Sequence, residues 1–149
     1  MRAITTETVI PAPASEVWAA LTDLDRYHEW NPFIREASGT VAVGSRLQLV
    51  MYAENGRATT FRPAVLTAEE GRELRWLGRF LVPGLFDGEH YFHLEPTPDG
   101  GTRVIHGEDF RGLLVPFLGK LLEGTRRNFE AMNDALAARV AGRAAASRP

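Results

Sequence analysis

The sequence of 149 residues contains no cysteine, which excludes disulfide bonds, thiolate zinc sites and cysteine nucleophiles. It also lacks a long hydrophobic run. Its most apolar stretch, residues 112–122, contains Pro116 and Lys120 and is shorter than the roughly 20 residues that a membrane-spanning helix needs. The N-terminal segment reaches Glu7 before any apolar stretch, unlike a secretory signal. We therefore expect a cytoplasmic protein without stable membrane insertion.

An excess of charge of one sign is absent too, because 17 lysines and arginines stand against 19 aspartates and glutamates. Without a basic stripe we expect no nucleic-acid partner. The sequence has no P-loop, dinucleotide fingerprint or Ser-His-Asp order, and Gly100-Gly101 is typical of a turn. The length and a hydrophobic fraction of 44% fit one globular domain, which we place at residues 1–142, followed by a flexible tail at 143–149.

The first part of the chain predicts one strand and two short helices. Residues 3–10 are rich in Thr, Val and Ile, which favours a strand. Residues 16–21 carry apolar side chains at helical spacing, with Ser15 or Ala14 in the position of the N-cap. Residues 28–33 predict a second, broken helical turn, because a proline disfavours helix at the residue before it.

From Ile34 onward the apolar side chains recur at every second position, which is the period of a strand. The pattern predicts strands at residues 46–52, 57–68, 72–81, 86–95 and 102–110. Tight turns such as Asn55-Gly56 separate them and favour an antiparallel meander. After Gly112 the period returns to 3.6 and predicts one long amphipathic helix, with Pro116 in its first turn.

This order of elements predicts an α+β fold in which a curved antiparallel sheet of about seven strands surrounds a long C-terminal helix. Such a sheet is wider than one helix, which is about 10 Å across. The sheet must therefore curl, and it packs tightly against the helix along one seam only. We expect the remaining space, lined by alternate strand residues, to form a pocket for a small molecule.

Five short segments, spread over nearly the whole chain, carry a resemblance to a known superfamily. They are Ile10-Pro11-Ala12-Pro13-Ala14-Ser15-Glu16-Val17-Trp18, Leu21-Thr22-Asp23, Trp30-Asn31-Pro32, Gly101-Thr102-Arg103-Val104 and Phe110-Arg111-Gly112-Leu113-Leu114. With this order of elements the chain resembles the START/Bet v 1-like (SRPBCC) superfamily and its bacterial polyketide cyclase/dehydrase and lipid-transport group. The resemblance implies the helix-grip fold. It does not imply one activity, because the superfamily includes lipid carriers, hormone receptors, aromatase/cyclases and chaperone activators.

Two neighbouring strands place polar side chains on the face that we expect to point inward. If the hairpin between them turns near Asp99, Phe92 lies opposite His106 and His90 lies opposite Glu108. Directly opposite residues have Cβ atoms roughly 5 Å apart, which is near enough for a hydrogen bond. We therefore predict a polar cluster of two histidines and one glutamate inside an apolar pocket.

The rest of the predicted lining comes from the sheet, the second helical turn and the long helix. It comprises Trp30, Phe33, Leu49, Met51, Phe61, Val65, Leu74, Trp76, Phe80, Phe92, Phe110, Leu118, Leu122, Thr125, Phe129 and Asn133. Residues 30–33 form either a gate at the pocket mouth or plain core packing.

Three roles remain open for the polar cluster of His90, His106 and Glu108. It can act as a catalytic acid and base, anchor a polar group of the ligand, or serve only as a satisfied buried hydrogen-bonded group. A metal site needs three side chains that converge on one point, and nothing in the sequence fixes that convergence. His93 does not help, because its odd spacing from His90 puts it on the other strand face. We expect no metal and no cofactor.

The sequence therefore predicts a protein that binds a hydrophobic small molecule (a lipid, an isoprenoid or an aromatic polyketide-like compound) as a carrier or sensor. The resemblance also implies an alternative, an aromatase/cyclase-like dehydratase that uses Glu108 with His90 or His106. A second alternative is an interaction protein like the chaperone activators, with a vestigial pocket. The expected partner is the small molecule, and the expected state is a monomer or homodimer.

Overall fold

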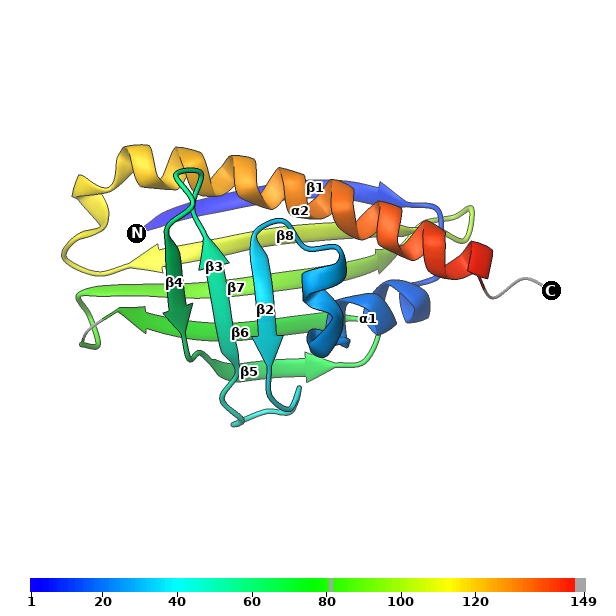
Figure 1. Ribbon diagram of the computed structural model, residues 1–149, viewed down its shortest axis with the longest axis horizontal. Helices are drawn as coiled ribbons and strands as arrows, with labels where there is room; N and C mark the ends of the chain where they lie inside the picture. The colour runs from blue at the N-terminus through cyan, green and yellow to red at the C-terminus, as the bar shows by residue number, and fades with distance from the viewer. Residues whose placement is uncertain (81, 147–149) are drawn as a thin grey trace.

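One long helix lies across a five-stranded antiparallel sheet in the computed structural model, which describes residues 1–80 and 82–146 (Figure 1). The elements follow in the order β1 (Arg2–Ile10), α1 (Ala14–Thr22), the 3-10 helix η1 (Leu24–Glu29), β2 (Ile34–Ser38), β3 (Gln48–Tyr52), β4 (Ala58–Phe61), β5 (Ala64–Glu69), β6 (Glu73–Phe80), β7 (Phe86–Pro96), β8 (Thr102–Arg111), the 3-10 helix η2 (Val115–Phe117) and α2 (Gly119–Ala146).

The strands form two sheets. The larger has the order β1-β8-β7-β6-β5, and the smaller, β2-β3-β4, crosses in front of it (Figure 1). Helix α2 packs against β1 and β8, and α1 packs against α2 and β7. Alternate residues of β7 and β8 are buried, which is the pattern of strands with one face on a core. The interior therefore lies between the large sheet, the small sheet and α2.

The predicted α+β helix-grip fold is confirmed, and so is the register of its central hairpin. His90 pairs with Glu108, and Phe92 pairs with His106. The period-two alternation also assigned the buried faces of both strands correctly, since all four of these side chains point inward and three of them are fully buried.

The predicted single sheet of about seven strands is corrected to eight strands in two sheets among the described residues. The expected strand at residues 57–68 is divided into β4 and β5 at Arg62 and Pro63. Pro63 has no backbone N–H to donate to a ladder, so pairing is interrupted there and the chain turns from one sheet into the other. Leu81, the expected end of β6, lies outside the described residues.

The helix boundaries also differ from those predicted. Pro13, not Ser15 or Ala14, is the N-cap of α1, and its carbonyl accepts the backbone N–H of Glu16 at 3.0 Å. Pro116 lies in the separate 3-10 turn η2, because Leu118 leaves helical geometry before α2 begins. Helix α2 continues to Ala146, beyond the boundary expected at residue 142, and residues 147–149 of the expected tail lie outside the described residues.

Candidate functional site

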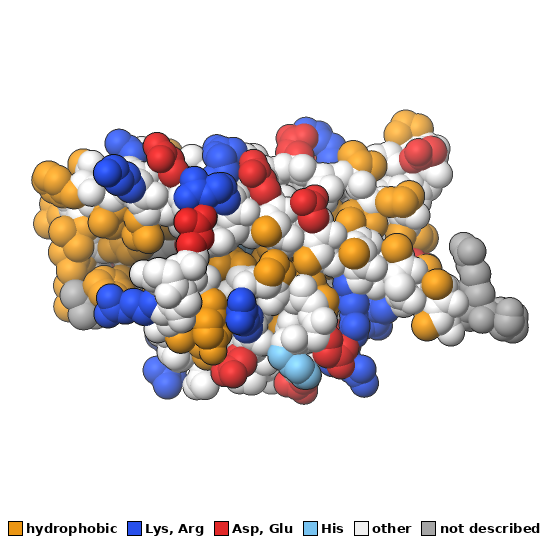
Figure 2. All heavy atoms as spheres, turned by 45° about the horizontal axis from the view of Figure 1, so that its top comes forward, with side chains coloured by type: hydrophobic (Ala, Val, Ile, Leu, Met, Phe, Trp, Pro, Cys, Tyr) orange, Lys and Arg blue, Asp and Glu red, His pale blue; other side chains and the backbone are white. Residues whose placement is uncertain are grey.

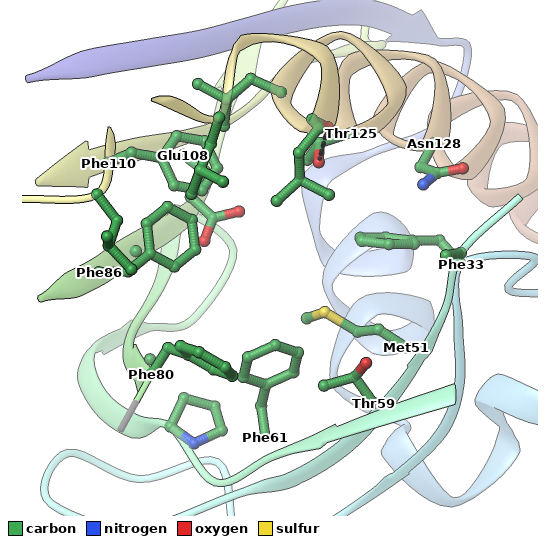
Figure 3. Close-up of a pocket in the computed structure, with 18 of the residues that line it drawn as sticks. Phe33, Met51, Thr59, Phe61, Phe80, Phe86, Glu108, Phe110, Thr125 and Asn128 are labelled. Atoms are coloured by element: carbon green, nitrogen blue, oxygen red, sulfur yellow. Dashed lines mark hydrogen bonds between the residues drawn. The ribbon is translucent and has the colours of Figure 1, made fainter. Parts of the chain in front are cut away.

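A cavity of about 360 Å³ lies between the large sheet, the small sheet and the first half of α2 (Figure 3). Its wall is mostly aromatic and aliphatic, and is formed by Phe33, Met51, Ala53, Thr59, Phe61, Pro63, Trp76, Gly78, Phe80, Phe86, Gly88, Glu108, Phe110, Leu114, Leu118, Leu121, Leu122, Thr125 and Asn128. Small-molecule sites commonly have volumes of this order and walls of this composition.

The cavity opens to solvent at the end of the molecule where α2 begins. Two residues of its wall, Phe80 and Leu121, are 43% and 53% exposed. Leu113 and Phe117, next to the start of α2, are also largely exposed. Figure 2 shows hydrophobic side chains gathered at this end around a hollow. An apolar ligand would therefore meet hydrophobic side chains at this end of the cavity.

Two glycines make room for the cavity in the face of the large sheet. Gly78 on β6 and Gly88 on β7 are register partners, so the sheet presents no side chain at this point. A Cβ atom on Gly88 would overlap Oε1 of Glu108, whereas a Cβ atom on Gly78 would meet its nearest neighbour at an ordinary 3.9 Å. Glycine at position 88 is thus what allows the carboxyl group of Glu108 to lie over β7.

Glu108 is the only ionisable residue among the described residues of the wall. Its carboxyl group points into the cavity beside Phe86 and Phe110 (Figure 3). The side chain is 17% exposed, and that exposure is to the cavity. Burial, together with the negative charge of Asp109, raises the pKa of Glu108 to about 8. At neutral pH the cavity wall therefore carries a carboxylic acid and not a carboxylate.

Four polar side chains continue from Glu108 into the interior, and we call the five residues together the polar chain. Oε2 of Glu108 lies 3.3 Å from Nδ1 of His90, whose Nε2 lies 2.8 Å from Nε2 of His106. Nδ1 of His106 lies 2.8 Å from Oδ1 of Asn133 on α2. The amide of Asn133 in turn lies 2.9 Å from Oγ1 of Thr6 on β1. The polar chain thus joins the cavity wall to the helix and the edge strand.

Aromatic rings enclose both histidines of the polar chain. Trp76 stacks on His90 with ring centres 4.7 Å apart, and Phe129 stacks on His106 at 4.2 Å. Burial lowers the pKa of His90 to about 3. Burial and the neighbouring His90 lower the pKa of His106 well below its ordinary value. Both imidazole rings are therefore neutral at neutral pH.

The two histidines and Glu108 follow one another in a line and do not converge on a common point. In residues 1–80 and 82–146, no three His, Cys, Asp or Glu side chains are grouped so that they could hold a metal ion. None of the helices in the same residues has both the length and the apolar composition needed to cross a bilayer.

The structure brings the predicted cluster of His90, His106 and Glu108 together, but only Glu108 reaches the cavity. The two histidines lie behind the wall, so they can act on a bound molecule only through Glu108. The other predicted lining residues that do form the wall are Phe33, Met51, Phe61, Trp76, Phe80, Phe110, Leu118, Leu122 and Thr125. Their contact with a ligand stays a prediction.

The remaining predicted lining residues do not form the wall, and this part of the prediction is corrected. They are Trp30, Leu49, Val65, Leu74, His90, Phe92, His106, Phe129 and Asn133. Strand alternation identifies the face on which a side chain lies but not its place along the interior. Trp30 packs on Tyr27 with ring centres 5.1 Å apart, so the predicted gate at residues 30–33 contributes only Phe33 to the wall.

Several wall residues were missed, including the polar Thr59 and Asn128 and the glycine Gly78. Asn128 follows Thr125 by three residues and Leu121 by seven, so the helical stripe through Leu121 and Thr125 already pointed to it. Nothing in the local sequence pointed to Thr59, because its place depends on how the small sheet crosses the large one.

A family model described as polyketide cyclase/dehydrase and lipid transport matches residues 1–141. The chain belongs to this family. No curated protein sequence matches the chain significantly.

Solved structures show the same fold at low sequence identity. The Zhui aromatase/cyclase from Streptomyces sp. R1128 superimposes with a TM-score of 0.79 at 16% identity, covering 96% of this chain and 95% of that one. A START superfamily protein from Mycobacterium smegmatis superimposes with a TM-score of 0.73 at 22% identity, covering 94% of this chain and 97% of that one. A protein from Thermus thermophilus superimposes with a TM-score of 0.75 at 22% identity, covering 99% of this chain and 100% of that one. The chain therefore shares the helix-grip fold with these proteins.

Proposed function

We propose that the protein binds a hydrophobic small molecule, such as a lipid, an isoprenoid or an aromatic polyketide-like compound, in the cavity beside α2. It acts as a carrier or sensor of that molecule, as a monomer or homodimer. The supporting observation is the cavity itself, whose apolar wall contains one carboxyl group and whose mouth is apolar. Transfer of apolar surface from water into such a space is favourable by about 25 cal/mol per Å².

A filled cavity tests this proposal. Gly78→Leu places a side chain in the cavity from a position where an added Cβ atom meets no close neighbour. We expect this variant to bind the neutral fluorescent probe N-phenyl-1-naphthylamine at least tenfold more weakly than the unchanged protein does. Gly142→Leu is the matched control, because Gly142 is exposed on α2 with open space around it. Equal binding by both variants would refute the proposal, and native mass spectrometry of protein from its own host would identify the ligand.

A second candidate function is that of an aromatase/cyclase-like dehydratase, and the protonated Glu108 in the cavity wall favours it. A carboxylic acid in a water-poor site can protonate a leaving hydroxyl group when it turns from its adjacent histidine toward the substrate. The similarity to the Streptomyces aromatase/cyclase supports this candidate at the level of the fold.

Glu108→Gln separates the two functions. Glutamine keeps the shape of the neutral acid but cannot release a proton, so binding should change only modestly while turnover of a poly-β-ketone analogue should stop. Unchanged turnover would exclude the enzymatic role of Glu108. An interaction protein with a vestigial pocket would instead keep its activity in Gly78→Leu.

A further inference from the structure

The hydrogen-bond donors and acceptors of the polar chain can be assigned in one way only. The assignment starts from Thr6, at the end of the chain farthest from the cavity. Oγ1 of Thr6 lies 2.9 Å from the backbone carbonyl of His106, and a carbonyl can only accept. The Thr6 hydroxyl therefore donates its proton to this carbonyl, and its oxygen must accept a hydrogen bond from the side-chain amide of Asn133, 2.9 Å away. The amide atom that faces Thr6 is thus the NH2 group. The orientation of Asn133 is thus fixed by Thr6.

Two acceptors then orient the imidazole ring of His106. The carbonyl oxygen of Asn133 faces Nδ1 of His106 at 2.8 Å, and the backbone carbonyl of Phe129 also accepts from this ring, so Nδ1 carries the hydrogen. In a neutral ring the Nε2 atom of His106 is then unprotonated and must accept a hydrogen bond from Nε2–H of His90, 2.8 Å away. Nδ1 of His90 is therefore unprotonated too, so Oε2 of Glu108, which faces it at 3.3 Å, must be the donor. Otherwise two hydrogen-bond acceptors, Nδ1 and Oε2, would face each other.

The neutral state of both rings follows from their surroundings. His90 and His106 are fully buried between Trp76, Phe92 and Phe129, and Glu108 is the one carboxylate partner that the described residues offer to a charge there. The depressed pKa values of both histidines and the raised pKa of Glu108 agree with this arrangement.

The arrangement leaves one free acceptor at the cavity. The carboxyl group of Glu108 donates its proton to His90 through Oε2. No described residue forms a hydrogen bond with the other oxygen, Oε1 of Glu108, which lies over Gly88. A carbonyl or carboxylate of a ligand placed here would meet only lone pairs. A hydroxyl group would donate to Oε1 while its carbon skeleton fills the apolar cavity.

We infer that Thr6 and Asn133 are positioning residues that hold Glu108 as a hydrogen-bond donor to His90, so that its free oxygen selects ligands with a hydroxyl group. This inference rests on the proposed function, because it names the chemistry of the ligand that the cavity binds.

The first experiment examines the polar chain without any ligand. Two-bond 15N–1H correlation spectra of the imidazole rings distinguish the two neutral tautomers. We expect the Nε2–H tautomer at His90 and the Nδ1–H tautomer at His106 near pH 7. The Nδ1–H tautomer at His90 would overturn the inference. Thr6→Val should weaken the preference for this pattern and populate the opposite tautomers in part, whereas the control Thr8→Val, on the same strand, should keep the single pattern.

The second experiment compares three probes of similar shape: 2-naphthol, 2-methylnaphthalene and 2-naphthoate. The unchanged protein should bind 2-naphthol about tenfold more tightly than either of the others, because only the naphthol donates to Oε1. Glu108→Leu should abolish this preference, and the conservative Glu108→Gln should restore it, since its amide donates to His90 and its oxygen still accepts. Equal binding of naphthol and methylnaphthalene, or tighter binding of naphthoate, would overturn the inference while leaving the proposed function intact.

Failure of all three probes to bind would count against the proposed function for aromatic ligands and would remove the assignment of a hydroxyl group. The tautomer measurement would still decide the role of Thr6 and Asn133 in that case.

Discussion

The two halves of α2 cover the same sheet but face different interiors. In the first half, Leu121, Thr125 and Asn128 look into the cavity, and Leu121 is 53% exposed. In the second half, Met132 and Leu136 are fully buried. Helix α1 packs beside α2 and supplies side chains that fill the interior where the second half lies (Figure 1).

The difference shows that the space beside the helix depends on what else covers the sheet. Under the first half of α2 the sheet presents the glycine pair Gly78 and Gly88, and no second α-helix of the described residues covers it. Phe129 and His106 stand at the boundary, stacked on each other. One helix thus provides stability at one end and room for a ligand at the other, with the polar chain between them.

The largest expected effect compares one leucine from each half of α2. Leu136→Ala should lower the free energy of unfolding by about 2–5 kcal/mol, because it leaves a cavity in a filled core. Leu121→Ala should lower it by less than about 1 kcal/mol, because this side chain is already half in solvent and borders open space. Urea denaturation measures both. Similar losses in the two variants would show that the first half is as tightly packed as the second.

The next effect, smaller for each unit of pH, is the pH dependence of stability, and it separates Glu108 from the histidines behind it. The pKa of Glu108 rises from 4.5 to about 8 on folding, so the stability that it contributes is present below pH 4.5 and is lost as the pH rises through 8. The pKa of His90 falls from 6.5 to about 3, so its contribution is present above pH 6.5 and is lost as the pH falls.

Glu108→Gln should therefore remove the loss on the alkaline side, which is at most about 1.4 kcal/mol per pH unit, and keep the loss on the acid side. Urea denaturation of both proteins from pH 4 to pH 9 provides the measurement. If the free energy of unfolding changed with pH in the same way in both proteins across this whole range, Glu108 would not be a buried acid at the cavity wall.

The smallest expected effect concerns the rates at which a ligand enters and leaves the cavity past the β3–β4 turn. Arg127 of α2 forms a two-pronged ion pair with Glu54 in the β3–β4 turn, with contacts of 2.8 and 3.2 Å. The neighbouring Ala53 and Asn128 line the cavity. Arg127→Gln should speed both entry and exit of N-phenyl-1-naphthylamine severalfold in stopped-flow measurements, while affinity and stability stay nearly constant because the pair is exposed.

Arg72→Gln is the control for that experiment, because it breaks a similar exposed pair, with Glu69, in a turn that does not line the cavity. High salt should bring the rates of the unchanged protein toward those of Arg127→Gln. Equal rates in both variants would show that the ion pair does not hold the cavity closed.

Much of the site followed from short-range rules. The hairpin turn near Asp99 predicted that His90 pairs with Glu108 and Phe92 with His106, because an antiparallel register is set by its turn. The split of residues 57–68 at Pro63 was missed, although the missing N–H of proline is itself a sequence signal.

The sequence by itself determined that a strand and short helices precede a strand meander and one long helix. It also determined the buried faces of β7 and β8 and the pairing of a histidine with a glutamate on them. These depend on alternation and tight turns, which act over a few residues. Only the tertiary structure decided that Glu108 faces a cavity and that His106 meets Asn133 and, through it, Thr6. Those contacts join residues as far apart as 6 and 133, and they exist because α2 docks at one particular depth and rotation on the sheet.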